Sequence, residues 1–260
     1  MNKISATTNI GMAQINVKRG DIDANLKTHY AVIDEAHKHS VDVLIFPELS
    51  LTGYEPDLAQ SLAIEVNSNI LDDLKAKAIR YNMTIMVGAP KLTNTDQPLV
   101  ALFIIDNSGV VTTYSKMYLH PGEDAYFSRG DLLCQRTINN LNYSLAICAD
   151  TSNEQHIIDS ITPQSKFYLA SALISHAGYE SDSLRLREYA CKYNLIVGLS
   201  NFIGESGSYT CAGKSGFYNH DGSILTQLPS NVTGIAIATY HNDGILLGKS
   251  IIISRQAQVD

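Results

Sequence analysis

Residues 143–150, with the sequence YSLAICAD, place an apolar run directly before a cysteine and a polar turn. A short apolar run of this kind predicts a strand that is covered on both faces. Cys148 ends this strand, and we expect a helix to begin close behind it, near Asn153. Taken alone, a cysteine here is most often a small buried core residue. At a strand end its thiol would instead be accessible beside backbone N–H groups, a placement that suits a nucleophile.

Similar apolar runs recur along the chain and predict a fold rich in buried strands. The further runs cover residues 43–46, 84–87, 99–105, 167–170, 195–199 and 234–238. Amphipathic helical patterns lie between some of them: after Asp21, near residues 71–78, after Asn153 and over residues 184–193. Residues 220–223, HDGS, are a hairpin-turn signal. Because a purely parallel sheet would not explain hairpins, we expect an α/β fold of two mixed sheets packed together, with helices outside.

The composition predicts a single domain over residues 1–260. Hydrophobic residues make up 45% of the chain and charged residues 17%, so a sizeable core can form. No Pro-, Gly- or Ser-rich linker divides the sequence. The formal net charge of -7 argues against a nucleic-acid partner, and no apolar stretch approaches the roughly 20 residues of a membrane helix. We therefore expect neither nucleic acid nor a membrane as a partner.

The cysteine and histidine spacings predict no metal site. The four cysteines form no CxxC pair and lack metal-ligand spacing: Cys134, Cys148, Cys191 and Cys211. His37 and His39 lie two residues apart, on different faces of a helix, which is more typical of a solvated surface. The first ten residues lack the apolar core of a secretory signal. We therefore expect a cytoplasmic protein with free thiols and no cofactor.

Two other expected strands also end in a chemically useful residue. Glu48 follows the run VLIFP of residues 43–47, and Lys116 follows the alternating segment of residues 110–115. Alone, each is more simply an exposed loop acid or a solvated edge lysine. At a semi-buried strand end, a carboxylate has a raised pKa and can take a proton from a thiol. A nearby ammonium can stabilise both a thiolate and an oxyanion.

In this order and at these separations, the segments resemble the nitrilase superfamily of carbon–nitrogen hydrolases along nearly the whole chain. FPE at residues 46–48, followed by TGY at 52–54, is similar to the glutamate motif of that family. YSK at residues 114–116 with LH at 119–120 is similar to its lysine motif, and ICAD at residues 147–150 to its cysteine motif. Glu123, which precedes AYFSRG at residues 125–130, resembles a second glutamate of the family active site.

The resemblance implies a four-layer α-β-β-α sandwich, frequent dimerisation through the sandwich and a triad of Glu48, Lys116 and Cys148. Glu48 is then the base that takes the Cys148 proton and later protonates the leaving amine or ammonia. Lys116 and the N–H near Ala149 stabilise the oxyanion, and a thioester forms on Cys148. Glu123 orients Lys116 or positions the substrate. The expected substrate is a small molecule, and no metal or organic cofactor is required.

The expected substrate contacts come from the loops that follow these strands: Tyr54, Ala149, Asp150, Ser171 and Ala172. Asp150 either faces a polar or cationic group of the substrate or caps the turn that follows it, and the cap is the favoured alternative. Ser171 and Ala172 follow the strand that starts near residue 167, where small residues also fit plain close packing.

The residues after Cys148 bear on the substrate class. Nitrilases of this family follow the cysteine with Trp-Glu, whereas Ala149 and Asp150 stand here, which favours amides or N-carbamoyl compounds over nitriles. Several amide-cleaving relatives have an arginine soon after the cysteine that grips a carboxylate, but the first arginine after Cys148 here is Arg185. Three alternatives stay open: an acyltransferase or amine-transfer enzyme with the same triad, a glutaminase subunit, and a catalytically silent binding protein.

Overall fold

The computed structural model describes residues 7–241, 243–244 and 246–253. The first sheet contains β1 (Thr7–Gln14), β2 (Val43–Ile45), β3 (Thr84–Lys91), β4 (Leu99–Ile105), β5 (Val111–Ser115), β14 (Gly234–His241) and β15 (Leu246–Ile252). The second sheet contains β6 (Gln135–Ile138), β7 (Leu141–Ile147), β8 (Ser165–Ser171), β9 (Ile196–Ser200), β12 (Gly216–Tyr218) and β13 (Ile224–Gln227). A separate hairpin joins β10 (Ile203–Ser206) and β11 (Tyr209–Ala212). The helices are α1 (Ile22–Lys38), α2 (Asp72–Tyr81), α3 (Glu154–Ser160) and α4 (Tyr179–Tyr193), with short 3-10 helices η1 (Pro56–Leu58), η2 (Asn69–Leu71), η3 (Glu123–Ala125) and η4 (Cys148–Ser152).

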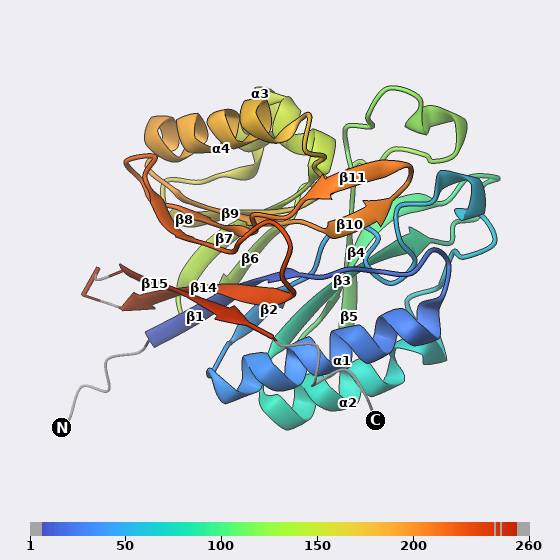
Figure 1. The fold of residues 1–260 in the computed structure, drawn as a ribbon, viewed down its shortest axis with the longest axis horizontal. Coiled ribbons are helices and arrows are strands. Elements are labelled where there is room, and N and C mark those ends of the chain that lie inside the picture. Colours follow the sequence, from blue (N-terminus) through green and yellow to red (C-terminus); the bar gives the residue numbers. More distant parts are fainter. Residues whose placement is uncertain (1–6, 242, 245, 254–260) are drawn as a thin grey trace.

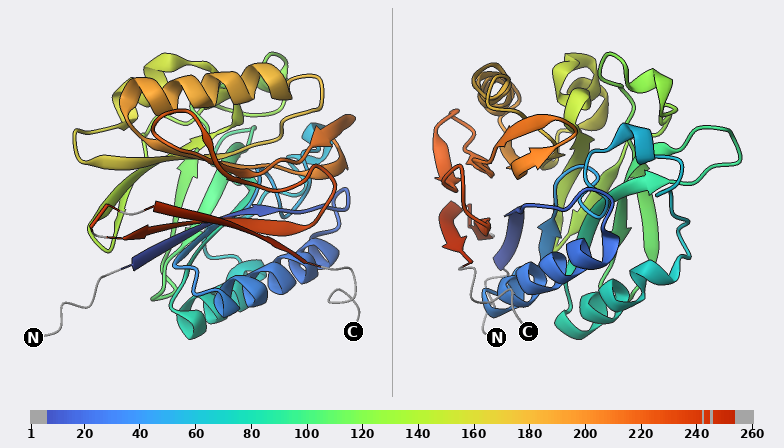
Figure 2. Two further views of the ribbon diagram at one scale, coloured as in Figure 1. Left: turned by 60° about the vertical axis from the view of Figure 1, so that its left-hand side comes forward. Right: turned by 45° about the vertical axis from the view of Figure 1, so that its right-hand side comes forward.

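The two sheets pack face to face, and helices cover their outer faces (Figure 1). α1 and α2 lie on the seven-stranded sheet, and α3 and α4 lie on the six-stranded sheet, as the turned views of Figure 2 also show. One continuous apolar cluster includes the space between the sheets, with Met12 and Ile45 from one sheet and Leu169 from the other. The predicted α/β sandwich of two mixed sheets with outer helices is therefore confirmed.

Strand direction brings several strand ends to one edge of the sandwich. β1, β2 and β3 run parallel, and so do β7, β8 and β9, each pair being joined through a helix. β4 is antiparallel to both β3 and β5, so β5 points the same way as β2. The segments that follow β2, β5, β7 and β8 are therefore available to build one site.

Most expected elements are present, but the sequence did not predict β1, β6, β15 or the β10–β11 hairpin. β1 carries polar residues that its neighbours satisfy: the Gln14 side chain donates to Pro229 O and Val232 O at 2.7 and 2.8 Å. The expected cap at Asp21 is confirmed, because its carboxylate accepts a hydrogen bond from Ala24 N at 3.0 Å. In the part of the chain that the structure describes, no helix is long and apolar enough to cross a membrane. The first ten residues, which the sequence predicts to carry no secretory signal, lie largely outside the described part of the chain.

Candidate active site

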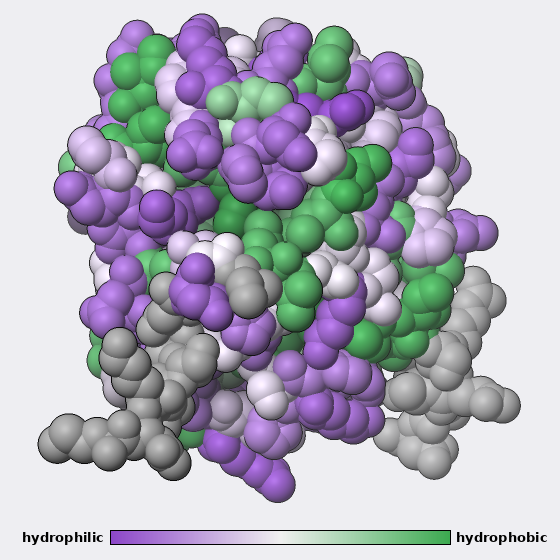
Figure 3. Space-filling model, turned by 90° about the vertical axis from the view of Figure 1, so that its left-hand side faces the viewer, coloured by the Kyte–Doolittle hydropathy of each residue, from purple (hydrophilic) through white to green (hydrophobic). Residues whose placement is uncertain are grey.

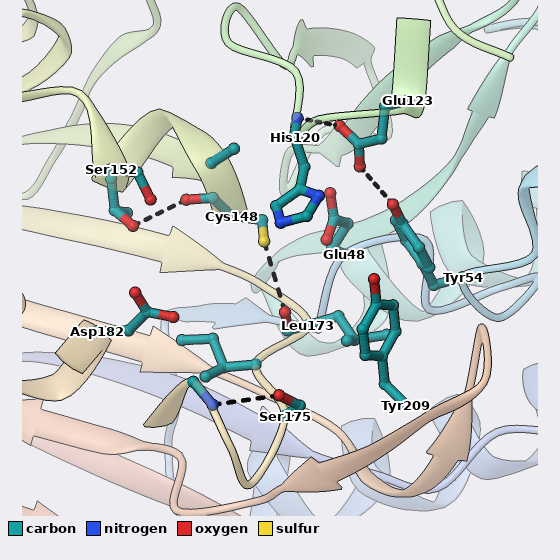
Figure 4. Close-up of a pocket in the computed structure, with 14 residues that line it drawn as sticks. Glu48, Tyr54, His120, Glu123, Cys148, Ser152, Leu173, Ser175, Asp182 and Tyr209 are labelled. Atoms are coloured by element: carbon teal, nitrogen blue, oxygen red, sulfur yellow. Dashed lines mark hydrogen bonds between the residues drawn. The ribbon is translucent and has the colours of Figure 1, made fainter. Parts of the chain in front are cut away.

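Glu48, Lys116 and Cys148 meet between the sheets at the edge where β2, β5 and β7 end. Lys116 Nζ donates to Glu48 Oε1 and to Glu123 Oε1, both at 2.7 Å. Glu48 and Lys116 are fully buried, and Glu123 is 3% exposed. Cys148 is half-buried and lines the same cavity as Glu48 (Figure 4). The four residues expected from the sequence to do the chemistry are thus brought together by the fold.

Cys148 stands on a strained turn. Its φ is 43°, in the left-handed region that residues with a Cβ rarely adopt. The turn ends β7 and begins the 3-10 helix η4, whose first turn includes the N–H of Ala149. The thiol donates to Leu173 O at 3.5 Å, and Thr151 Oγ1 donates to Cys148 O at 2.8 Å. The turn therefore exposes Sγ to the cavity beside N–H groups that lack partners within the helix.

The loop that carries Glu48 depends on a close approach to β3. A Cβ added to Gly88 would lie 2.2 Å from Leu49 N, so only glycine fits beneath this loop. Leu49 itself has a φ of 53°. Gly88 N donates to Ser50 Oγ at 3.1 Å, and Leu51 N donates to Gly88 O at 2.9 Å. These bonds fix the backbone after the glutamate, and Phe46 N, which donates to Met86 O at 2.9 Å, fixes it before the glutamate.

Glu123 connects the lysine to a tyrosine of the glutamate loop. Tyr54 Oη donates to Glu123 Oε1 at 2.7 Å, and His120 N donates to Glu123 Oε2 at 2.7 Å. Glu123 therefore accepts hydrogen bonds from Tyr54, His120 and Lys116, which holds the ammonium in place between two carboxylates. Gly130, in the segment after Glu123, donates its N–H to Lys116 O at 2.7 Å, which ties that segment to the end of β5.

Burial and charge set the protonation states of the site. Burial raises the pKa of Glu48 to about 7, although the Lys116 ammonium acts to lower it. Burial also raises the pKa of the Cys148 thiol well above its ordinary value, and the Glu48 carboxylate raises it further. Burial acts to lower the pKa of Lys116, but the charges of Glu48, Cys148 and Glu123 outweigh it and raise that pKa. At neutral pH the cysteine is therefore a thiol beside a carboxylate that can accept its proton.

Both Glu48 and Lys116 have hydrogen-bonding capacity left for a reactant. Among the described residues, Glu48 Oε2 is the buried side-chain oxygen without a hydrogen-bond partner. An ammonium has three N–H donors, and Lys116 uses two of them on Glu48 and Glu123. One acceptor and one donor are thus free at the site. That pair can take a proton from a thiol and stabilise an oxyanion.

The cavity in front of Cys148 has a volume of about 200 Å³. Leu173, Ile174 and Tyr209 give it an apolar wall, and Tyr54 and Ala149 line it as expected from the sequence. Sequence reasoning missed Tyr209, because the β10–β11 hairpin that carries it was not expected. It also missed the side chain of His120, which extends toward Cys148 and Glu48 in Figure 4. For His120, its place in the lysine motif was an available signal.

Asp150 does not line the cavity, and its expected contact with the substrate stays a prediction. Its side chain is fully buried and accepts from Ile147 N at 2.9 Å, so it caps the start of η4, the turn that contains it, and not the following turn that the sequence favoured. The carboxylate also accepts from Met117 N and Tyr118 N, at 3.0 and 2.9 Å, and from Tyr114 Oη at 2.7 Å. Asp150 therefore joins the cysteine turn of one sheet to the lysine loop of the other.

Ser171 and Ala172 also lie outside the cavity wall. Ser171 is fully buried, and its hydroxyl donates to Phe46 O at 2.8 Å across the two sheets. Ala172 is 1% exposed, and its N–H donates to Ser200 O. The part of this strand end that reaches the cavity begins at Leu173. The alternative of close packing therefore describes both residues better than substrate contact does.

The described residues contain no group of three or more His, Cys, Asp or Glu side chains placed to hold a metal ion. The geometry is instead that of an acid–base and nucleophile cluster. Comparison with known proteins agrees with it: the sequence pattern of the carbon-nitrogen hydrolase family matches residues 9–245. The chain belongs to the carbon–nitrogen hydrolase family. The resemblance to the nitrilase superfamily and the expectation of a carbon–nitrogen hydrolase are both confirmed.

The curated relatives of this chain include an amidase and longer glutamine-dependent synthetases. The chain is 27% identical to the 2-oxoglutaramate amidase of Bacillus subtilis over 221 residues, which covers 84% of this chain and 85% of that one. It is 24% identical to the glutamine-dependent NAD(+) synthetase of Thermotoga maritima over 228 residues, but spans only 39% of the synthetase. The solved amidase from Nesterenkonia sp. AN1 superposes with a TM-score of 0.81 at 18% identity, covering 88% and 92% of the two chains. This last likeness concerns the fold.

Proposed function

We propose that this hydrolase cleaves a small amide through a thioester on Cys148. One observation carries the proposal: a thiol on a strained turn shares a cavity with a carboxylate, and that carboxylate has a free oxygen and a pKa of about 7. A base whose pKa lies near the working pH is suited to proton transfer. The buried ammonium of Lys116 next to that carboxylate supplies the charge that an oxyanion needs.

The reaction begins when Glu48 Oε2 accepts the thiol proton and Sγ attacks the carbonyl carbon of the amide. The carbonyl electron pair moves onto oxygen, where the free N–H of Lys116 and the N–H of Ala149 stabilise the oxyanion. The C–N bond then breaks, and Glu48 gives its proton to the departing nitrogen, which leaves as ammonia or an amine. The acyl group remains on Cys148 as a thioester.

Water completes the cycle. Glu48, again a carboxylate, takes a proton from water as the water oxygen attacks the thioester carbon. The second oxyanion collapses, the C–S bond breaks, and the thiolate recovers a proton from Glu48. An acid is released and the free thiol is restored. Glu123 acts through Lys116, because its carboxylate holds the ammonium in place.

An ammonia-release assay over amides, N-carbamoyl compounds and nitriles tests the proposal. Cys148→Ala should release no ammonia from any compound while keeping the wild-type circular dichroism spectrum. Cys191→Ala is the matched control, since Cys191 is an exposed thiol of α4, and it should retain turnover. A Cys148→Ala protein with near-normal turnover would overturn the assignment. Product formation only after an acceptor amine is added would instead indicate an acyltransferase.

We also propose that the protein self-associates and that it resides in the reducing cytoplasm. Exposed apolar side chains lie on the edge strands β13 and β15, namely Ile224, Leu247 and Ile252. Apolar residues also gather near the centre of the face shown in Figure 3. Contiguous apolar surface of this kind is typical of an interaction site, which supports a homodimer or higher homo-oligomer.

A further inference from the structure

The cavity has a second polar end, on the far side of Cys148 from the catalytic carboxylate. Ser152 and Asp182 lie on one side of the cysteine in Figure 4, and Glu48 and Tyr54 lie on the other. Ser152 belongs to η4 and Asp182 to α4, so two elements that are distant in the sequence build this end. An amide bound at Cys148 would therefore extend its remaining atoms toward Ser152 and Asp182.

Arg185 brings a positive charge next to this end of the cavity, through its bonds to the lining residues Asp182 and Ser152, and does not itself line the cavity. Its Nη1 donates to Asp182 Oδ1 at 2.7 Å and to Ser152 Oγ at 3.4 Å. The side chains of Arg185 and Asp182 are 30% and 27% exposed, so both remain accessible. Among the described residues, Arg185 Nε and Nη2 make no hydrogen bond, and neither does Asp182 Oδ2. The pair thus offers two free guanidinium donors next to one free carboxylate oxygen.

The charges at this end match a dipolar group better than a single charge. A lone carboxylate on the substrate would be attracted by Arg185 but repelled by Asp182. A lone ammonium would be attracted by Asp182 but repelled by Arg185. The rest of the cavity is not cationic either, because Glu48 and Glu123 share the single ammonium of Lys116. A substrate end that carries both an ammonium and a carboxylate satisfies both members of the pair.

We propose that Arg185 and Asp182 form a subsite for an α-amino-acid group, so that the substrate is a small amide with a zwitterionic far end. The substrate carboxylate binds the free guanidinium N–H groups of Arg185, together with the Ser152 hydroxyl, and its ammonium donates to Asp182 Oδ2. This inference rests on the proposed amide hydrolysis at Cys148. The residues directly after Cys148 include no arginine that could bind a substrate carboxylate. The inference assigns that role to Arg185 of α4.

Amides that share a four-carbon butanamide skeleton test the subsite by removing one charged group at a time. L-Glutamine carries both groups, glutaramate only the carboxylate, 4-aminobutanamide only the ammonium, and butyramide neither. We expect wild-type kcat/KM to be highest for glutamine, and about tenfold or more above that for butyramide, the scale of one charge-assisted hydrogen bond. A wild-type enzyme that hydrolyses butyramide as efficiently as glutamine would overturn the proposal.

Two variants test whether Arg185 binds the substrate carboxylate and Asp182 binds the substrate ammonium. In Arg185→Gln, the preference for glutamine over 4-aminobutanamide should fall about tenfold, and in Asp182→Asn the preference for glutamine over glutaramate should fall similarly. Arg187→Gln is the matched control on the same helix, because Arg187 Nε donates to Gly222 O instead; its preference ratios should equal those of the wild type. Unchanged ratios in Arg185→Gln and Asp182→Asn would refute the subsite.

A binding measurement separates this inference from the proposed reaction. Calorimetry of Cys148→Ala with L-glutamine should give a dissociation constant that rises about tenfold when Arg185→Gln is added. If no amide yields ammonia but this binding and its loss are observed, the subsite stands and the proposed hydrolysis fails. If amides are hydrolysed but glutamine binds no better than butyramide, the hydrolysis stands and the subsite fails.

Discussion

Replacement of Asp150 by alanine would test how the two halves of the active site are held together. The carboxylate accepts from the N–H groups of Ile147, Met117 and Tyr118 and from the hydroxyl of Tyr114. Each buried donor left without a partner costs about 1–3 kcal/mol. Water that enters the space recovers part of this, so we expect Asp150→Ala to lower the free energy of unfolding by about 4 kcal/mol.

Turnover should fall as well, because the lost bonds position the lysine loop against the cysteine turn. A displacement of about 1 Å at a catalytic group typically costs about a hundredfold in rate. Urea denaturation followed by circular dichroism measures the stability, and ammonia release measures kcat. Asp150→Asn should lie between wild type and alanine, since its amide oxygen can still accept from Met117 N and Tyr118 N while its NH₂ group faces Ile147 N.

Asp159→Ala is the matched control for this prediction. Asp159 is an exposed residue of α3, and among the described residues its carboxylate accepts from Gln155 Nε2 alone, so the change should stay within about 0.5 kcal/mol. If Asp150→Ala is within about 1 kcal/mol of the wild type and keeps normal kcat, the carboxylate neither stabilises nor positions the site, and the argument from its hydrogen bonds is wrong.

The remaining predictions concern the chemistry and the loop that carries the base. Because Glu48 must be ionised to take the thiol proton, and burial raises its pKa to about 7, kcat/KM should rise as the pH increases through about 7; a profile that is flat from pH 5 to 9 would exclude this base. Lys116→Gln removes an oxyanion donor and should lower kcat at least about a hundredfold in single-turnover assays, whereas a near-normal kcat would remove Lys116 from the mechanism. Gly88→Ala forces a Cβ to within 2.2 Å of Leu49 N, so thermal unfolding should show a loss of more than about 2 kcal/mol together with reduced turnover; an unaltered melting temperature would show that the loop adapts freely.

The buried parallel strands could be predicted because burial on both faces leaves a continuous apolar run, as in β2, β7, β8 and β9. β1 could not, although it lies between β14 and β2 in the sheet. Its Asn9 and Gln14 look like surface residues until the partners of their side chains are known: Ser40 O for Asn9, and the distant Pro229 O and Val232 O for Gln14. Hydrogen bonds between residues far apart in the sequence leave no periodicity to detect.

The candidate site also combines residues that the sequence predicts with contacts that only the fold reveals. Glu48, Lys116 and Cys148 could be expected from their places at strand ends and from the surrounding motifs. The hydrogen-bond partners of Asp150 could not, because the sequence favours a cap over a ligand contact but does not show which N–H groups the carboxylate accepts from. Only the backbone N–H groups of a loop from the other sheet decide between the two. The subsite at Arg185 was equally hidden, since it depends on how α4 lies against η4.

The packing of the two sheets has a consequence for how this enzyme is inactivated. Glu48 and Lys116 belong to one sheet and Cys148 to the other, and Ser171 and Asp150 bond across the boundary beside them. A slight slippage of the sheets would separate the thiol from its proposed base while every strand and helix remained formed. On heating, catalysis should therefore fail at a lower temperature than the secondary structure. The upper limit of useful temperature is then set by the rigidity of the boundary, and substitutions that tighten it should extend the working range without any change in the catalytic groups.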